Sequence, residues 1–211
     1  MIVIHHLGAS QSDRVVWLME ELGLPYELKW YNRKADRLAP DEYLALHPAA
    51  TAPVIQDGDR TLVESAAIVE YICHRYAGGR FTVGPSRPEY YDYLYWMHFN
   101  NNLLGLFFGK LALRGNPEGP DAQRVAGLIQ RRENGYFRHL EQTLGKTPYL
   151  AGAEFTCADI MTMFVLTNLA IGLARKFDDL PNTQAYMKRI AARPAYAKAM
   201  AIAGPKATPP G

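Results

Sequence analysis

The first third of the chain alternates short apolar runs with stretches of amphipathic helical pattern. Residues 2–6 form an apolar run of strand length, and the segment after Ser12 repeats apolar residues at the helical period. Ser12 is expected to cap this helix, Gly23 ends it and Pro25 blocks its continuation. Residues 26–30 then alternate in polarity as a second strand does. A strand–helix–strand unit of this kind predicts parallel pairing through a right-handed crossover.

The next part of the chain contains a short helix, two strands and a longer helix. A short helix is predicted at 40–46, and strands are predicted at 54–55 and 61–63 with a tight turn at 57–59 between them. Ser65 is then expected to cap the longer helix. The order predicts a small mixed sheet with helices on its faces, as in the thioredoxin fold.

The rest of the chain carries helical periodicity and no convincing strand pair. A turn-rich linker at 79–88 separates it from the first part. We therefore predict an α/β thioredoxin-like domain over 1–78 and an all-α helical domain over 89–211. The predicted helices of the second domain span 88–113, 121–144, 157–175, 183–192 and 195–203.

The sharpest local signal in the second domain lies at 155–160. Thr156 and Asp159 have the spacing of a capping box, and Phe155 and Ile160 are placed as the hydrophobic staple around it. The helix that follows is apolar nearly all round. It is therefore expected to be the central helix of this domain.

Composition narrows the function classes. The 211 residues carry a formal net charge of +2, which favours neither nucleic acid nor an anionic membrane as a partner. Two cysteines, Cys73 and Cys157, without a C-x-x-C motif disfavour a disulfide scaffold, a zinc ribbon and a dithiol redox centre. The apolar runs 103–113 and 160–174 are shorter than the ~20 residues that a membrane span needs. No signal peptide is evident, so we expect a cytoplasmic protein. We also expect no bound metal, because the cysteines lack the spacing of metal ligands.

The segment around 51–68 has the properties of a peptide-binding site. Ala52, next to Pro53, is placed to offer its backbone as a strand edge to an extended ligand. The free N–H groups at the start of the Ser65 helix suit a carboxylate, and Glu64 beside them suits an ammonium group.

Four motifs in this chain stand in the order found in one family. They are Ser10-Gln11-Ser12-Asp13-Arg14, Ala52-Pro53-Val54-Ile55, Leu62–Ile68 and the box at Thr156–Asp159. Together they make the chain resemble the cytosolic glutathione transferases over nearly all of its length. The S-Q-x-x-R pattern resembles the bacterial serine-type members of the theta-like and related classes. The resemblance implies a cis peptide bond before Pro53.

The resemblance implies that Ser10 is the catalytic residue, which holds the glutathione thiol as a thiolate. Lowering a thiol pKa by ~2 units takes about 2.7 kcal/mol. One hydrogen bond to a charged group supplies roughly 1.5–3 kcal/mol, so no general base is needed. Ser12 competes for this role, and we assign it to the helix cap. Arg14 is expected to bridge the loop and the helix.

The other glutathione contacts follow from the same resemblance. Glu64 and Ser65 would hold the γ-glutamyl amino and carboxylate groups, while Ala52 pairs its backbone with the ligand's cysteine and Pro53 shapes that edge. The candidates for the glycine carboxylate are Arg33, Lys34 and Arg37, with Thr51 as a further donor; Ala50-Thr51 stands where relatives often have Gly and a long polar side chain.

Two histidines and one aromatic stretch have competing interpretations. His5 and His6 are adjacent on a strand and point to opposite faces, so we expect a strand role and not a metal site. The helix at 88–113 offers an aromatic lining for the second substrate, although a core or dimer face must account for at least half of it. Its aromatic and polar members are Tyr90, Tyr91, Tyr93, Tyr95, Trp96, His98, Phe99 and Asn100 to Asn102.

We therefore expect a homodimeric glutathione transferase that adds glutathione to small apolar electrophiles in detoxification, with peroxidase activity as a further possibility. A glutathione-dependent isomerase or dehalogenase on the same scaffold is the first alternative. A non-catalytic binding protein is the second, and Ala50-Thr51 and the asparagine triplet are the features that keep it open.

Overall fold

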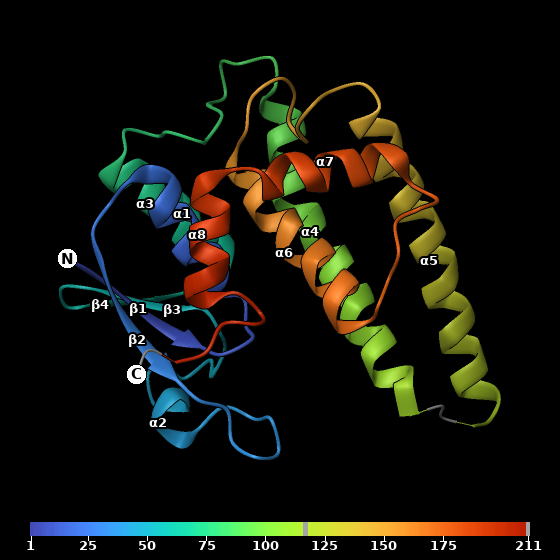
Figure 1. The fold of residues 1–211 in the computed structure, drawn as a ribbon, viewed down its shortest axis with the longest axis horizontal. Helices are drawn as coiled ribbons and strands as arrows, with labels where there is room; N and C mark the ends of the chain where they lie inside the picture. Colours follow the sequence, from blue (N-terminus) through green and yellow to red (C-terminus); the bar gives the residue numbers. More distant parts are fainter. Residues whose placement is uncertain (116–117, 210–211) are drawn as a thin grey trace. The chain divides into compact units, whose positions relative to one another are not determined.

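The computed structural model describes residues 1–115 and 118–209. They form two compact units, Met1–Thr82 with Ile190–Gly211 and Val83–Arg189. The elements of the first unit are β1 (Ile2–Leu7), α1 (Asp13–Leu22), β2 (Tyr26–Tyr31), α2 (Asp41–Leu44), β3 (Val54–Asp57), β4 (Arg60–Val63), α3 (Ser65–Tyr76) and α8 (Pro194–Ala203) (Figure 1). Those of the second are α4 (Tyr90–Ala112), the 3-10 turn η1 (Leu113–Gly115), α5 (Pro120–Leu144), α6 (Cys157–Gly172) and α7 (Pro181–Ala191), which ends at the boundary.

The first unit is built on a four-stranded mixed sheet with the strand order β2-β1-β3-β4. Strand β1 pairs parallel with β2 and antiparallel with β3, and β3 pairs antiparallel with β4. The short, apolar residues of β1 fill the interior of this unit, with Ile2 and Ile4 buried. This is the predicted thioredoxin-like sheet, and the two-strand hairpin lies where the sequence placed it.

Helix α8 belongs to the first unit because it packs along α1, and the two helices lie side by side (Figure 1). The ring of Tyr196 meets Trp17 edge-on with centroids 4.8 Å apart. The guanidinium of Arg193 donates to both carboxylate oxygens of Glu21, at 2.7 and 2.8 Å. The sequence places this helix in the predicted domain over 89–211, and its contacts group it with α1.

The starts of two helices differ from the prediction. Ser12 occupies the N-cap position of α1, but its side chain makes no capping hydrogen bond there. The N-cap residue of α3 is Glu64 and not Ser65, which is the first helical residue. In both places the serine hydroxyl is bonded to a side chain outside its own helix, His6 of β1 for Ser12 and Gln11 of the Ser10 loop for Ser65, so the hydroxyl does not cap the helix end.

The second unit is helical, and α6 is its central element. Helix α6 packs against α4, and residues on all sides of α6 are buried, among them Ile160, Val165 and Leu169. This confirms the interpretation of its apolar sequence. Among the described residues, no helix combines the length and apolar character that a membrane crossing requires.

The predicted capping box at the start of α6 is present. The backbone N–H of Thr156 donates to Asp159 Oδ2 at 2.8 Å. The other carboxylate oxygen of Asp159 accepts from the backbone N–H of Leu150 and from the hydroxyl of Tyr186, both at 3.0 Å. One buried carboxylate therefore fixes the helix start, the preceding loop and α7.

Replacing Asp159 with Ala is predicted to destabilise the protein by about 3–5 kcal/mol, because it removes the acceptor of buried donors from Leu150, Thr156 and Tyr186. Urea unfolding followed by circular dichroism measures this loss. Asp121→Ala is the matched control, since Asp121 also lies in the first turn of a helix but is exposed. An equal effect of the two substitutions would contradict the assigned role of Asp159.

Asp13, in the first turn of α1, is a buried acid whose Oδ1 atom has no hydrogen-bond partner among the described residues. Burial raises the pKa of Asp13 to about 8, and the adjacent Arg14 charge and a backbone hydrogen bond only partly oppose this. The folded state therefore holds this proton more tightly than the unfolded chain does. The resulting stability is present below the unfolded pKa of about 4 and is lost as pH rises through about 8.

Asp13→Asn is predicted to remove this part of the pH dependence, because the amide cannot ionise. Unfolding free energies from urea titrations at a series of pH values between 5 and about 9 test it. The wild type should lose stability relative to the variant as pH rises. The exposed first-turn acid of α4 gives the control Asp92→Asn, whose curve should run parallel to that of the wild type. A constant difference between wild type and Asp13→Asn would refute the prediction.

Candidate functional site

Four chain segments that carry the predicted site residues meet at one edge of the sheet. Because β1 and β2 are parallel, the loops that follow Leu7 and Tyr31 leave the sheet on the same side. Val54 pairs with His5 and with Val63, so the residues just before β3 and just after β4 lie at that side too. The register alone therefore collects the Ser10 loop, the Arg33 loop, Thr51 to Pro53, and Glu64 with Ser65.

The Ser10 loop contains a chain of buried polar groups. Ser10 Oγ lies 2.8 Å from Ser12 Oγ, and Ser12 Oγ lies 2.8 Å from His6 Nδ1. The backbone N–H of Ser12 also donates to Ser10 Oγ at 3.4 Å. Ser10 keeps 7% of its surface exposed, whereas Ser12 and His6 have none. Ser10 is thus the outermost group of the three.

His6 is neutral in this setting. Burial, together with the positive charge of Arg33, lowers the pKa of His6 to about 4. Its ring packs against Trp30 of the neighbouring strand, with centroids 4.4 Å apart. His5 has the separate strand role that was expected, since its Nδ1 lies 2.9 Å from the Tyr31 hydroxyl.

A buried guanidinium joins the Ser10 loop to the start of α3. One terminal nitrogen of Arg14 donates to Gln11 Oε1 at 2.5 Å and to Ser65 Oγ at 3.2 Å. Ser65 Oγ in turn donates to Gln11 Oε1 at 3.3 Å. Burial lowers the pKa of Arg14 to about 10, so the group stays charged at neutral pH. The bridging role predicted for Arg14 is confirmed, and its partner in α3 is Ser65, one of the predicted site residues.

The residues on the far side of the site have unusual backbone conformations. Glu64 has φ +72°, a left-handed value that costs a non-glycine residue free energy and is concentrated at functional sites. Its side chain is exposed beside the first N–H groups of α3. The Ala52–Pro53 peptide bond is cis, as the resemblance implied. Ala50 also has a positive φ, +50°, and Thr51 after it is exposed.

The three candidate cations of the second loop differ in their contacts. Arg33 donates to the carbonyls of Gly8, Ala9 and Arg37 at 2.7, 3.2 and 2.9 Å. Burial lowers the pKa of Arg33. Lys34 is ion-paired with Asp41 at 3.3 Å. Arg33 is therefore the cation that is anchored directly to the Ser10 loop.

Sequence reasoning missed two residues of this network, Gln11 and the buried partner His6. Gln11 was quoted only as part of a motif, although it accepts from both Arg14 and Ser65. A signal for His6 was present, because it shares a strand face with the buried Ile2 and Ile4 and a polar group on such a face needs a partner.

The aromatic stretch of α4 divides between the interior and the surface of the second unit. Tyr93, Trp96 and Phe99 are buried, as is Asn100, whereas Tyr91 is 73% exposed. Trp96 stacks on His139 of α5 with centroids 5.1 Å apart. A core role therefore accounts for much of this stretch, as expected.

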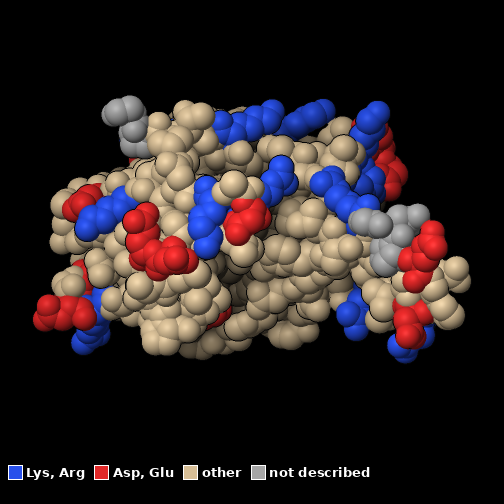
Figure 2. Space-filling model, turned by 90° about the horizontal axis from the view of Figure 1, so that it is seen from below, with Lys and Arg blue, Asp and Glu red and all other residues tan. Residues whose placement is uncertain are grey.

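The structure bears on two other classes of site, a metal site and a surface that binds a polyanion. Within residues 1–115 and 118–209, no cluster of three His, Cys, Asp or Glu side chains is arranged to hold a metal ion. On the face in Figure 2, basic and acidic side chains occur next to one another. This interspersed pattern differs from the single-sign field that draws in a polyanion.

Comparison with known proteins gives the same family over both units. The family models match at residues 9–75 (glutathione S-transferase, N-terminal domain) and at residues 109–201 (glutathione S-transferase, C-terminal domain). Glutathione S-transferase 3 of Schizosaccharomyces pombe is 31% identical over 176 residues, which cover 78% of this chain and 72% of that protein.

Solved structures agree. A glutathione S-transferase of Actinobacillus pleuropneumoniae matches with a TM-score of 0.82 and 34% identity, covering 98% of this chain and 95% of the other. A glutathione transferase of Phanerochaete chrysosporium, solved in complex with oxidized glutathione, matches with a TM-score of 0.75 and 27% identity over 94% of each chain. On these matches and on its fold, the chain belongs to the glutathione S-transferase family.

Proposed function

We propose that the protein is an active glutathione transferase in which Ser10 holds the glutathione thiol as a thiolate. The observation that carries the proposal is the meeting of the Ser10 loop, the strand edge at Ala52 and Pro53, and the Glu64–Ser65 corner at one end of the sheet. The Phanerochaete chrysosporium relative with bound oxidized glutathione supports the choice of ligand.

Each part of the tripeptide has a counterpart at this edge. The ligand's cysteine, which is extended, pairs with the backbone of Ala52, whose orientation Pro53 fixes. Its γ-glutamyl carboxylate accepts from the first backbone N–H groups of α3, that of Ser65 among them, where the helix dipole favours an anion. Its ammonium group binds the exposed carboxylate of Glu64.

The glycine carboxylate is assigned to Arg33, with Thr51 as a second donor. A guanidinium carries more N–H groups than the three that Arg33 donates to backbone carbonyls, so it retains donors for an anion. Lys34 is less suited, because Asp41 already neutralises it.

The chemistry needs only that the anion be stabilised. The thiolate sulfur attacks the electrophilic carbon, a sulfur–carbon bond forms, and the leaving group departs with its electron pair or the added charge is protonated by solvent. Ser10 donates a hydrogen bond to the sulfur before the attack and so raises the fraction of thiolate at neutral pH. The positive end of α1 contributes about 0.5–1 kcal/mol more.

The finer assignments belong to this proposal as well. We assign the protein to the serine-type, theta-like group, since Ser10 and the S-Q-x-x-R motif precede α1. We further propose a cytoplasmic homodimer that serves in detoxification, with small apolar electrophiles as substrates and organic hydroperoxides as a second class.

Ser10→Ala is predicted to lower kcat/KM at neutral pH by about 10- to 100-fold, the equivalent of one charge-assisted hydrogen bond. The pH profile of kcat/KM with a generic aromatic electrophile should shift to higher pH by about 1–2 units, because the thiol is then less acidic. Ser86→Ala, at an exposed serine, is the control. Unchanged turnover in Ser10→Ala, or no binding of millimolar glutathione to the wild type, would exclude this function.

Glu64→Gln is predicted to weaken glutathione binding about ten-fold while it leaves the thiol pKa unchanged, because the carboxylate meets the ammonium group and not the sulfur. Isothermal titration calorimetry measures the affinity. Asp59→Asn, in the exposed turn of the β3–β4 hairpin, is the matched control and should bind like the wild type. Equal affinities of Glu64→Gln and the wild type would remove Glu64 from the site.

A further inference from the structure

The hydroxyl groups of Ser10 and Ser12 form a hydrogen-bonded series that ends at the buried imidazole of His6. The contact between Ser12 and His6 is not needed to form the helix. Ser12 stands at the N-cap of α1, where a serine normally bonds a backbone N–H and contributes about 1 kcal/mol. Here its Oγ lies between His6 Nδ1 and Ser10 Oγ, at 2.8 Å from each. The helix start forgoes its side-chain cap, and the hydroxyl serves the loop instead.

The hydrogen bonds that link Ser10, Ser12 and His6 can have either of two donor-to-acceptor orientations, and the two have opposite consequences for a ligand. If Ser10 donates to Ser12 and Ser12 donates to a bare His6 Nδ1, the Ser10 proton points inward and only its lone pairs face outward. If His6 Nδ1–H donates to Ser12 and Ser12 donates to Ser10, the Ser10 proton is free to point outward. Only the second direction gives a thiolate a donor.

The surroundings of Ser10 and His6 favour the outward direction. Ser10 Oγ already accepts from the backbone N–H of Ser12, so its oxygen acts as an acceptor within the loop. The other ring nitrogen of His6, Nε2, is buried with no hydrogen-bond partner among the described residues. A buried N–H without an acceptor is the rarer and costlier defect, so the ring proton belongs on Nδ1.

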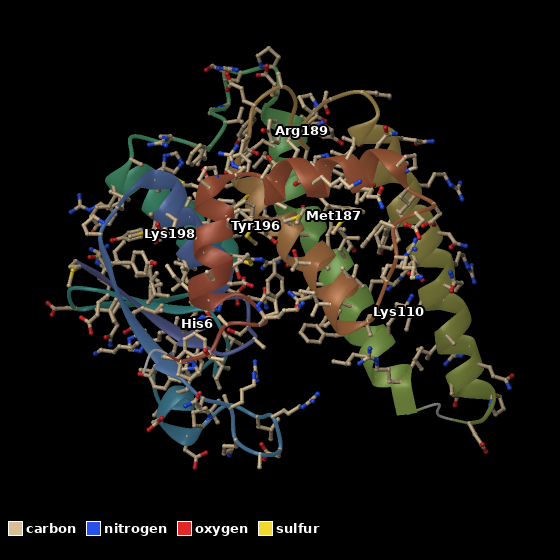
Figure 3. All side chains as sticks on the ribbon, viewed as in Figure 1. His6, Lys110, Met187, Arg189, Tyr196 and Lys198 are labelled. Atoms are coloured by element: carbon tan, nitrogen blue, oxygen red, sulfur yellow. The ribbon has the colours of Figure 1, made fainter. Side chains whose placement is uncertain are left out.

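His6 is placed for this task by the strand. His6 lies on β1 (Figure 3), next to β2 in the sheet. The ring of Trp30 of β2 packs against its imidazole. The charged group that acts on it is Arg33, whose positive charge opposes a second proton on the ring. A neutral imidazole in one orientation has a single N–H, so its direction is defined.

We propose that His6 is a positioning residue for the thiol chemistry: held as the Nδ1–H tautomer, it donates to Ser12, which donates to Ser10 and leaves the Ser10 proton for the glutathione thiolate. The proposal rests on the proposed function of Ser10. Successive hydrogen bonds polarise one another, so the chain also makes Ser10 a stronger donor. No proton is transferred along it, and His6 does not touch the ligand.

The first test is the tautomer itself, read by nitrogen-15 NMR of the histidine rings in the wild-type protein. The expected result is a proton on Nδ1 of His6 and a bare Nε2. A proton on Nε2 would overturn the proposal without any variant. This measurement stays decisive if a substitution at His6 prevents folding.

The second test is the pKa of the bound glutathione thiol, measured by the ultraviolet absorbance of the thiolate as a function of pH. His6→Phe, which keeps an aromatic ring against Trp30, and Ser12→Ala should each raise it by about one unit, a ten-fold loss of thiolate at neutral pH. The KM for glutathione should change little. His6→Asn should recover most of the effect, because its amide can donate from nearly the same position as Nδ1. His5→Asn is the control, since His5 bonds to Tyr31 and should leave the thiol pKa unchanged.

The outcomes separate this proposal from the one on which it rests. If Ser10→Ala raises the thiol pKa but His6→Phe and Ser12→Ala do not, the relay is refuted and the role of Ser10 stands. If Ser10→Ala has no effect while Ser12→Ala does, Ser12 itself contacts the thiol and the relay is refuted. If glutathione does not bind, the proposed function fails first.

Discussion

Strand β1 is parallel to one neighbour and antiparallel to the other, and this pairing decides where the loops of the first unit meet. The parallel partner β2 is reached through α1, so its loop returns to the same edge as the Ser10 loop. The antiparallel partner β3 enters at that edge with Ala52 and Pro53, and β4 leaves there into Glu64. A shift of one residue would exchange Ile4 and His6 with His5 and Leu7 between the two faces of the sheet, and all four are buried, so the packing on both faces fixes the register.

Next to this edge of the sheet lies a group of buried polar side chains. Their burial lowers the stability of the fold, but their hydrogen bonds hold the neighbouring segments in one arrangement. Arg14 is charged and almost fully buried, and hydrogen bonds to its neighbours Gln11 and Ser65 offset part of the cost of burying the charge. Asp13 and His6 are both held in neutral forms by the same burial. The guanidinium stays ionised and joins the start of α1 to the start of α3, more than fifty residues away in the sequence. Such groups specify one arrangement of the loops, whereas an apolar core would tolerate several.

The sequence predicts those features of the structure that depend on residues close together along the chain. The strand alternation, the hairpin turn and the capping box of Thr156 and Asp159 involve residues a few positions apart, and all three predictions are confirmed. The cap predicted for Ser65 failed because Gln11 and Arg14, from a distant segment, bind its hydroxyl. The position of α8 could not be predicted from its hydrophobic periodicity, because an apolar helix face does not identify the helix that packs against it. The roles of the site residues stay predictions, because each role is a contact with a ligand and does not follow from how the chain packs on itself.

The sequence does not decide whether Ser10 or Ser12 contacts the thiol. The answer depends on which hydroxyl can donate a hydrogen bond to the ligand. Ser12 is enclosed, with a partner on each side of its oxygen, so a thiolate that bound there would have to displace Ser10 or His6. Ser10 has partners only on its inner side among the contacts of this loop, and it retains some exposure. In the proposed arrangement the two serines are therefore not rivals. One presents the proton to the sulfur, and the other, fixed by a neutral imidazole, ensures that the proton points that way.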